Sequence, residues 1–319
     1  MGKIVKNENI GQVFEFPWLD FLKAEKHGDI EAQNYALNRM QGDPRIEKLF
    51  EDCEEFYSKP LKRHNDAAHP LHELGLLIDF GFDYDNLRMK KILDSIVDKI
   101  TEEGYFPILI EIPQAFSKKK FGVFESWILC DFPNLLYYLI KAGLKEDKKV
   151  RKAVLNLEKL SDSNGWRCKG DIEGFRGPGK KDDFCPYANL ISLKVFSLLS
   201  EYHEREFIRN AIDAFYSHWE NQKEKKYYMF GIGTDFRKLK YPNVWFDILH
   251  VCRVLKSFEY ARKNPVYSEM LEIIDKKRQQ DGFFKAESVY RVYKEFDFGQ
   301  KKCVSPTLTY FIEELLYKD

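Results

Sequence analysis

Hydrophobic and polar residues alternate along this chain in two kinds of segment, each about as long as a helix. Segments of the first kind are almost wholly apolar and begin at a proline. Five of them align on Pro70, Pro133, Pro186, Pro242 and Pro306. Proline is best tolerated in the first turn of a helix, because the N–H that it lacks would have no partner there. The pattern therefore predicts five buried helices, each beginning at its proline.

The segments of the second kind are charged, and their apolar residues recur at the spacing of an amphipathic helix. Four of them follow a residue that commonly caps a helix N-terminus, namely Asp43, Asp85, Asp147 and Asn264. We expect amphipathic outer helices over residues 45–57, 86–100, 148–160, 205–219 and 266–280.

Glycine followed by an aromatic residue closes three of the outer segments, at Gly104, Gly165 and Gly282. Glycine is the usual residue just beyond a helix C-terminus, and we expect the aromatic residue to pack into the layer below. The apolar faces of each pair of inner and outer helices must be covered by the neighbouring pairs. A row of such pairs that closes into a ring also buries the two pairs at its ends. The sequence thus predicts an all-α fold, an α/α toroid of about six helix pairs, (α/α)6. Residues 1–319 would form one domain, in which helices in 1–42 complete the ring and 43–319 carry helical-hairpin repeats.

Composition and charge narrow the classes of partner. The chain has 51 basic and 51 acidic residues, so its formal charge is zero and no nucleic-acid partner is expected. No apolar run reaches the roughly 18 residues of a membrane span, and the first residues do not resemble a signal peptide. We expect a cytoplasmic protein. Its six cysteines show no CxxC pair, which argues against a zinc ribbon or a disulfide framework and favours mostly reduced thiols; no metal ligands are assigned.

The turn sequences at 280–284 (QDGFF), 163–166 (SNGW) and 103–105 (EGY) occupy the same phase of the repeat. They resemble the repeat of the terpenoid cyclases and the protein prenyltransferase β subunits, and above all prenyltransferase/squalene-cyclase-like proteins of about this length. The resemblance covers roughly residues 43–319. It implies a toroid with a central cavity, and it says less about activity because one fold serves several functions.

Two functional signatures of these families are incomplete in this chain. The Asp-x-Asp-Asp acid of squalene-type cyclases has its nearest counterpart at 83–86 (DYDN), which lacks the last carboxylate. Aligning Gly81 with Gly143 places Asp85 over Asp147, so we interpret Asp85 as a helix cap. The Asp-x-Cys zinc ligands of the prenyltransferases are absent, and the nearest substitutes are at 130–131 (CD), or at 247, 250 and 252.

Polar residues on a buried helix indicate the face that meets a cavity, because buried polar groups need partners or water. Positions +1, +5 and +8 from each proline share one face, and four of the five helices carry polar residues there. Asp247 and His250, one turn apart, are the acid/base candidates, with a structural hydrogen-bonded pair as the alternative. The residues expected to bind a ligand in the interior are Asn134, Tyr138, Tyr187, Asn243 and Trp245.

Two further groups lie in connecting loops. The glycine-rich, basic stretch 170–181 (GDIEGFRGPGKK) is suited to an anion, because backbone N–H groups can approach it closely. A solvated loop is the alternative. Near the first apolar segment, His64, His69, His72 and Glu73 either cap a helix or converge on a metal. The residues expected to hold a diphosphate are Lys169, Arg176, Lys180 and Lys181.

Three hypotheses for function follow. The first is an isoprenoid-type enzyme that binds a prenyl diphosphate in an aromatic-lined cavity, where cation–π contacts stabilise a carbocation. The second is a non-catalytic toroid that binds a lipid, a peptide or a partner protein. The third is a glycan-processing (α/α)6 enzyme with paired carboxylates drawn from Glu73, Asp247 and Glu314. Catalysis itself, any cofactor and the oligomeric state are left open by the sequence.

Overall fold

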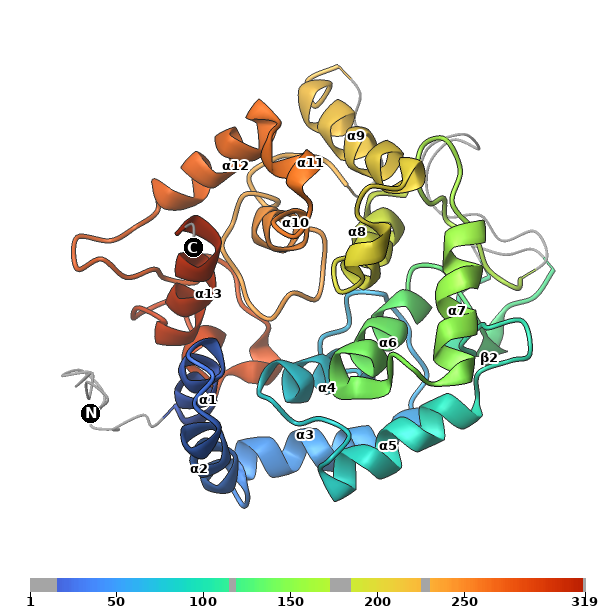
Figure 1. The fold of residues 1–319 in the computed structure, drawn as a ribbon, viewed down its shortest axis with the longest axis horizontal. Helices are drawn as coiled ribbons and strands as arrows, with labels where there is room; N and C mark the ends of the chain where they lie inside the picture. The colour runs from blue at the N-terminus through green and yellow to red at the C-terminus, as the bar shows by residue number, and fades with distance from the viewer. Residues whose placement is uncertain (1–15, 115–118, 173–184, 225–229, 318–319) are drawn as a thin grey trace.

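The computed structural model describes residues 16–114, 119–172, 185–224 and 230–317 and is mostly helical (Figure 1). These segments contain thirteen α-helices, which confirms the predicted helical class. They also contain an antiparallel hairpin of β1 (Ile108–Ile112) and β2 (Gly122–Ser126), which the sequence pattern did not predict; a single two-stranded sheet among these helices is consistent with the all-α class. Burial alternates along β1, as it does in a strand with one face on the core. Short turns of other helix types lie at η1 (Phe56–Ser58), η2 (Ile140–Leu144), η3 (Ser200–Tyr202), η4 (Arg291–Tyr293) and η5 (Asp297–Gly299).

The inner helices correspond to the proline-led segments. Four of the five carry their proline in the first turn, as predicted. The fourth segment departs from the prediction: Pro242 follows a cis peptide bond in a non-helical stretch, and the helix begins six residues later, capped by Asp247. The inner helices are α4 (Pro70–Asp79), α6 (Phe132–Leu139), α8 (Pro186–Phe196), α10 (Ile248–Leu255) and α13 (Pro306–Leu316).

The outer helices lie where the amphipathic pattern predicts them. Asp43, Asp147 and Asn264 accept hydrogen bonds from first-turn N–H groups, which confirms three caps. The fourth cap is Asn86 rather than Asp85, whose side chain is exposed; Asp85 is therefore neither a cap nor a buried acid. The outer helices are α3 (Pro44–Glu54), α5 (Leu87–Asp98), α7 (Lys148–Lys159), α9 (Glu206–Glu220) and α12 (Pro265–Asp275), with the short α11 (Glu259–Arg262) before α12.

Figure 1 shows the outer helices arranged around the inner ones. Successive inner helices α4, α6, α8, α10 and α13 pack against one another in chain order. The N-terminal helices α1 (Pro17–Lys26) and α2 (Ile30–Met40) pair with each other, and α1 packs against α13. Trp18 joins the two ends of the chain: its Nε1 donates to Oγ1 of Thr307 at 2.8 Å, and its ring stacks on Phe80 just after α4.

The three glycine–aromatic turns do not end helices directly. Gly104, Gly165 and Gly282 have positive φ, but each lies six or seven residues beyond the last residue of α5, α7 or α12. Each closes a tight turn instead, so the helix-stop interpretation is wrong in position. The packing expectation is confirmed, because Phe106, Trp166 and Phe284 are almost completely buried. The turn thus places one large aromatic side chain in the core after each of these outer helices.

Across the described segments, every helix is too short or too polar to cross a lipid bilayer.

Candidate functional site

The structure brings four of the predicted interior residues together. Asn134 and Tyr138 lie on α6, Tyr187 on α8 and Trp245 just before α10. Asn134 Nδ2 donates to the hydroxyl of Tyr187 at 3.4 Å, and the ring of Tyr187 lies 4.5 Å from that of Trp245. Asn134, Tyr138 and Tyr187 are at most 4 % exposed. The polar residues at positions +1 and +5 from Pro133, and at position +1 from Pro186, therefore do face a shared interior.

Asp247 and His250 are buried in this interior but are not paired through their side chains. Asp247 Oδ1 accepts the backbone N–H of His250 at 3.0 Å, whereas the ring Nδ1 of His250 is 2.9 Å from the carbonyl oxygen of Trp245. The shifted start of α10 explains the difference, because it makes Asp247 a cap rather than a residue of the helix face. Within the described residues, Asp247 Oδ2 and His250 Nε2 are buried without a hydrogen-bond partner.

Burial changes the proton affinity of both groups in ways that suit acid/base chemistry. The pKa of the Asp247 carboxyl is raised to about 7, because burial disfavours its charged form. Burial also lowers the pKa of His250 well below its usual range, and the positive charge of Lys194 adds to this effect. Near neutral pH Asp247 can hold a proton while His250 is a neutral imidazole. Asp247 thus has the property of a general acid, and His250 that of a neutral hydrogen-bonding group.

Replacing Asp247 by asparagine should stabilise the protein at pH 8 but not at pH 5. The folded state holds a proton on Asp247 between about pH 4 and pH 7 that the unfolded chain releases, so wild-type stability falls as the pH rises through this window. Asparagine keeps the cap and removes the titration. We expect a gain of about 1–3 kcal/mol at pH 8, measured by urea unfolding at both pH values.

Asp43→Asn is the matched control, because Asp43 also caps a helix. Its burial would raise the pKa, but hydrogen bonds from Arg45 outweigh this and hold the pKa below the usual value. Asp43→Asn should therefore lose stability at pH 8, the opposite sign. Equal behaviour of the two variants would contradict the assignment of Asp247 as a buried, protonated carboxyl.

Asn243 contacts a second group of residues. This group lies toward the C-terminal ends of the inner helices. Its Oδ1 accepts from Arg253 Nη1 at 3.0 Å. The positive charges of Arg253, Lys141 and Lys194 act together on the carboxylate of Asp79. Lys141 Nζ is 3.0 Å from Asp79 Oδ1. We call Lys141, Lys194 and Arg253 the cationic cluster.

The three positive charges of the cationic cluster surround the carboxylate of Asp79, and Glu25 acts on Lys141 as well. Burial alone would raise the pKa of Asp79, but Lys141, Arg253 and Lys194 reverse this and hold it well below the usual range. Lys194 makes no ion pair with Asp79 at hydrogen-bond distance in the described structure; its Nζ lies 4.4 Å from the ring centre of Tyr137. Burial lowers the pKa of Lys194 to about 8. The cluster is thus an incompletely neutralised positive site among aromatic rings.

This cluster was missed in the sequence, although part of its signal was present. Lys141 and Lys194 are eight residues after Pro133 and Pro186, on the same helix face that carries the polar residues Asn134 and Tyr138. Arg253 is not among the positions counted from Pro242, because α10 begins at Ile248 and not at that proline. His250 lies within electrostatic reach of Lys194 and Arg253, so the cationic cluster and the predicted acid/base pair border the same interior.

The predicted diphosphate loop falls largely outside the described residues. Arg176, Lys180 and Lys181 lie outside the described residues. Lys169 is described and exposed, and its Nζ donates to the carbonyl oxygen of Leu160 at 3.4 Å, at the C-terminal end of the outer helix α7. Lys169 therefore contacts the outer layer rather than the interior residues.

Two of the histidines near α4, His69 and His72, serve local structure. His69 caps the helix, its Nδ1 accepting the N–H of Leu71 at 3.1 Å, which confirms the capping alternative. His72 Nε2 is 2.8 Å from the carbonyl oxygen of His64. Glu73 is different: its Oε2 is buried without a partner in the described segments, and burial raises its pKa to about 8.

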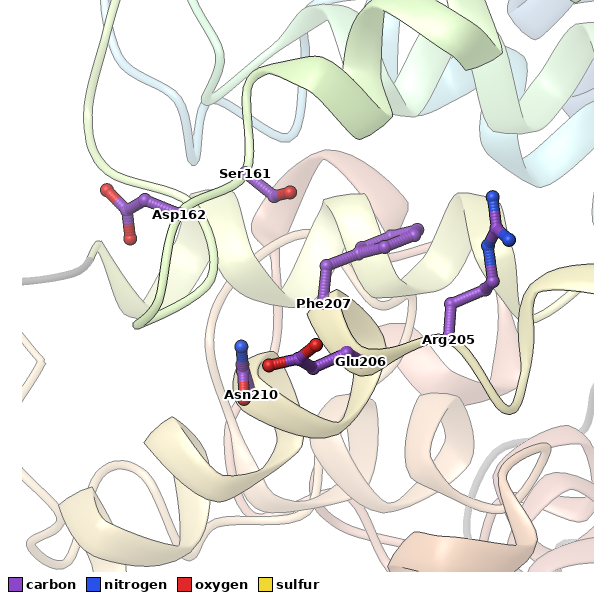
Figure 2. A pocket seen from close by; sticks show the side chains of 6 residues that line it. All are labelled: Ser161, Asp162, Arg205, Glu206, Phe207 and Asn210. Atoms are coloured by element: carbon purple, nitrogen blue, oxygen red, sulfur yellow. The ribbon is translucent and has the colours of Figure 1, made fainter.

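An open surface depression of about 420 Å³ lies on the outer layer, between the end of α7 and the start of α9 (Figure 2). Two of its charged groups already have partners: Asp162 pairs with Arg167 at 2.6 Å, and Arg205 pairs with Glu158 at 3.3 Å. We assign no ligand to it. Its lining residues are Ser161, Asp162, Arg205, Glu206, Phe207 and Asn210.

Comparison with known proteins adds no name to this site: no family model matches the chain, and no curated protein matches its sequence.

Proposed function

We propose that the helix pairs form a closed α/α toroid of about six pairs, with α1 and α2 as the sixth. The support is the unbroken order of contacts from α4 to α13 and the contact of α1 with α13. Residues in the C-terminal halves of α4, α8 and α10 would then face one another across the middle. This arrangement accounts for the convergence of Asp79, Lys194 and Arg253, which are 59 or more positions apart in the chain.

We propose further that this interior binds a prenyl diphosphate or a closely similar anionic, apolar-tailed molecule. The observation that carries this proposal is the half-buried ammonium of Lys194, which lies beside two other cations and makes no ion pair among the described residues. A partly buried cation that a nearby carboxylate neutralises only in part costs stability, and a bound anion would reduce that cost. The diphosphate is therefore assigned to the cationic cluster instead of the loop at 170–181.

The apolar tail would lie among the aromatic residues around the cluster. Tyr138 has its ring 5.6 Å from Lys194 Nζ and is also close to Gly75 of α4, while the rings of Tyr187 and Trp245 lie 4.5 Å apart with an interplanar angle of 34°. Aromatic faces can stabilise a cation that develops on a prenyl chain. Asp247 would supply or accept a proton, and His250 Nε2 would orient the ligand by a hydrogen bond.

A non-catalytic binding toroid is the second candidate. The tight packing of Asn134 and Tyr187 favours it: Asn134 donates to the hydroxyl of Tyr187, and that hydroxyl donates to the carbonyl oxygen of Val244. Both candidates require the cationic cluster to bind the ligand, and they differ only in whether Asp247 changes a reaction rate.

Ligand binding is tested by thermal unfolding of the wild-type chain with farnesyl diphosphate, geranylgeranyl diphosphate, inorganic pyrophosphate and farnesol. At one hundred times its Kd, a ligand raises the free energy of unfolding by about 2.7 kcal/mol. We expect this gain with the prenyl diphosphates, a smaller gain with pyrophosphate and none with farnesol at equal concentration. No gain with any diphosphate would contradict the proposal.

Lys194→Met should abolish that ligand effect and at the same time stabilise the free protein by about 1 kcal/mol near pH 7. The folded-state pKa of about 8 lies below the ordinary lysine value, so wild-type stability rises as the pH increases from about 8 to 10.5. Methionine does not titrate, so the stability of Lys194→Met lacks this pH dependence. The stability gain of the variant over the wild type should therefore shrink as the pH rises through that range. Urea unfolding at pH 7 and pH 10 measures both effects.

Lys169→Met is the matched control for ligand binding, since Lys169 is exposed and contacts α7. It should leave the diphosphate effect unchanged. If Lys169→Met removed the effect and Lys194→Met kept it, the anion site would belong to the loop instead.

A further inference from the structure

Three of the six cysteines, distant in sequence, meet near the N-terminal ends of α6 and α8. Cys130 Sγ lies 3.8 Å from Cys168 Sγ and 3.7 Å from Cys185 Sγ. These cysteines are not disulfide-bonded, and the separations far exceed the roughly 2.05 Å of a disulfide bond. We call Cys130, Cys168 and Cys185 the cysteine cluster. Sequence spacing concealed it, because the three residues come from three separate segments.

The backbone holds the three segments together. The N–H of Leu129 donates to the carbonyl oxygen of Lys169 at 2.8 Å, next to Cys130 and Cys168. The N–H of Cys185 donates to the carbonyl oxygen of Trp166 at 3.1 Å. Each cysteine is therefore adjacent to, or part of, a main-chain hydrogen bond that joins its segment to another. Such positioning is what a preorganised ligand set requires.

The sulfur separations match those of thiolates around one zinc ion. Zinc–sulfur bonds are about 2.3 Å long and structural zinc is tetrahedral, so two thiolates on the same ion lie roughly 3.8 Å apart. Both separations from Cys130 have this length. Soft thiolate ligands in a tetrahedral arrangement favour zinc among the common divalent metals.

A fourth ligand is available in His64. Its Nδ1 is 2.8 Å from Oδ1 of Asp131, which leaves Nε2 for another partner, and its ring lies within electrostatic reach of Cys185. Metal-ligating histidines commonly donate their other ring N–H to a carboxylate, which fixes the orientation of the ring. Asp131 is 1 % exposed, and nothing in the part of the chain described here pairs with its Oδ2. The pair thus has the form of a zinc ligand and its orienting carboxylate.

We propose that the cysteine cluster and His64 bind one zinc ion, with Asp131 as the positioning residue. In their present side-chain positions, no group of three or more His, Cys, Asp or Glu residues in the described segments is arranged to hold a metal ion. Closure requires rotation of Cys168 and His64, the two partly exposed members of the set. Four protein ligands leave no open coordination position, so the zinc would be structural and would tie α6 and α8 to the turn after α7. This site is independent of the proposed diphosphate site.

The first test is the zinc content of the full chain, expressed with zinc supplied and measured by elemental analysis and native mass spectrometry. We expect about one zinc per chain in the wild type. Cys130→Ser and Cys185→Ser should each lose it, whereas Cys303→Ser, a cysteine outside the cluster, should retain it. A wild type without zinc, or equal zinc in all four proteins, overturns the proposal.

A second test does not depend on whether the cysteine variants fold. Cobalt(II) replaces zinc in the wild type, and thiolate-to-cobalt charge transfer together with tetrahedral d–d absorption is expected. Asp131→Asn should retain a metal ion but weaken its affinity by roughly 10- to 100-fold, as measured by competition with a chelator. A cobalt spectrum without thiolate bands, or a disulfide within the cluster in protein freshly purified under air, contradicts the assignment.

Discussion

Trp18→Ala is expected to lower the free energy of unfolding by about 3–5 kcal/mol. The Trp18 side chain is completely buried, stacks on Phe80 with ring centres 5.2 Å apart and lies under the guanidinium of Arg45 at 4.6 Å. Removing it leaves a large cavity where α1 meets α13. It also removes the donor to Thr307 Oγ1, an oxygen that itself donates to Asp297 Oδ1 at 2.8 Å.

Trp18→Phe separates packing from hydrogen bonding. Phenylalanine retains much of the ring area but cannot donate to Thr307, so we expect a loss of about 1–2 kcal/mol. Urea unfolding, followed by far-UV circular dichroism, gives both values. A loss below 1 kcal/mol in Trp18→Ala would show that the contact between the chain ends does not stabilise the fold, and would weaken the proposal of a closed toroid.

Gly165→Ala is expected to cost about 3–4 kcal/mol, the second large effect. Gly165 has φ of 82°, a conformation that costs an L-residue roughly 1–2 kcal/mol. A Cβ there would lie 2.2 Å from Oδ1 of Asn189. Asn189 is fully buried: its Oδ1 accepts the N–H of Trp166, and its Nδ2 donates to the carbonyl oxygen of Ala211. The clash cannot be relieved without breaking these bonds.

Gly282→Ala is the matched control, because Gly282 lies in the equivalent turn after α12. Its φ is 84°, nearly the same, but a Cβ would meet nothing within 4 Å. We expect a loss of only about 1–2 kcal/mol, the cost of the backbone conformation alone. Similar losses in the two variants, measured by urea unfolding, would mean that Asn189 moves freely and that its buried hydrogen bonds contribute little.

The helices were predictable because their signals are local. The outer helices were found from amphipathic spacing and caps, and inner helices such as α4 and α13 from apolar runs led by proline. The errors have local causes as well. Pro242 looks like the other helix-leading prolines but lies in a non-helical stretch, and Asn86 competes with Asp85 for the same cap. The hairpin β1–β2 was missed because its alternating pattern is only five residues long in each strand.

The candidate site was only partly predictable. Asn134, Tyr138 and Tyr187 were found because polar residues on an apolar helix indicate an interior face. Lys194 was visible on that face, but its significance depends on Arg253, which comes from another helix.

By itself the sequence determined the helical class, the alternation of inner and outer helices and most of their boundaries, because these depend on the burial and capping of each segment. The tertiary structure alone decided which side chains meet: the cationic cluster around Asp79, the cysteine cluster beside His64, and the burial that gives Asp247 a pKa of about 7. Each of these depends on distances of a few ångströms between segments tens of residues apart. Charge, desolvation and metal ligation act over such distances, and no local pattern in the chain encodes them.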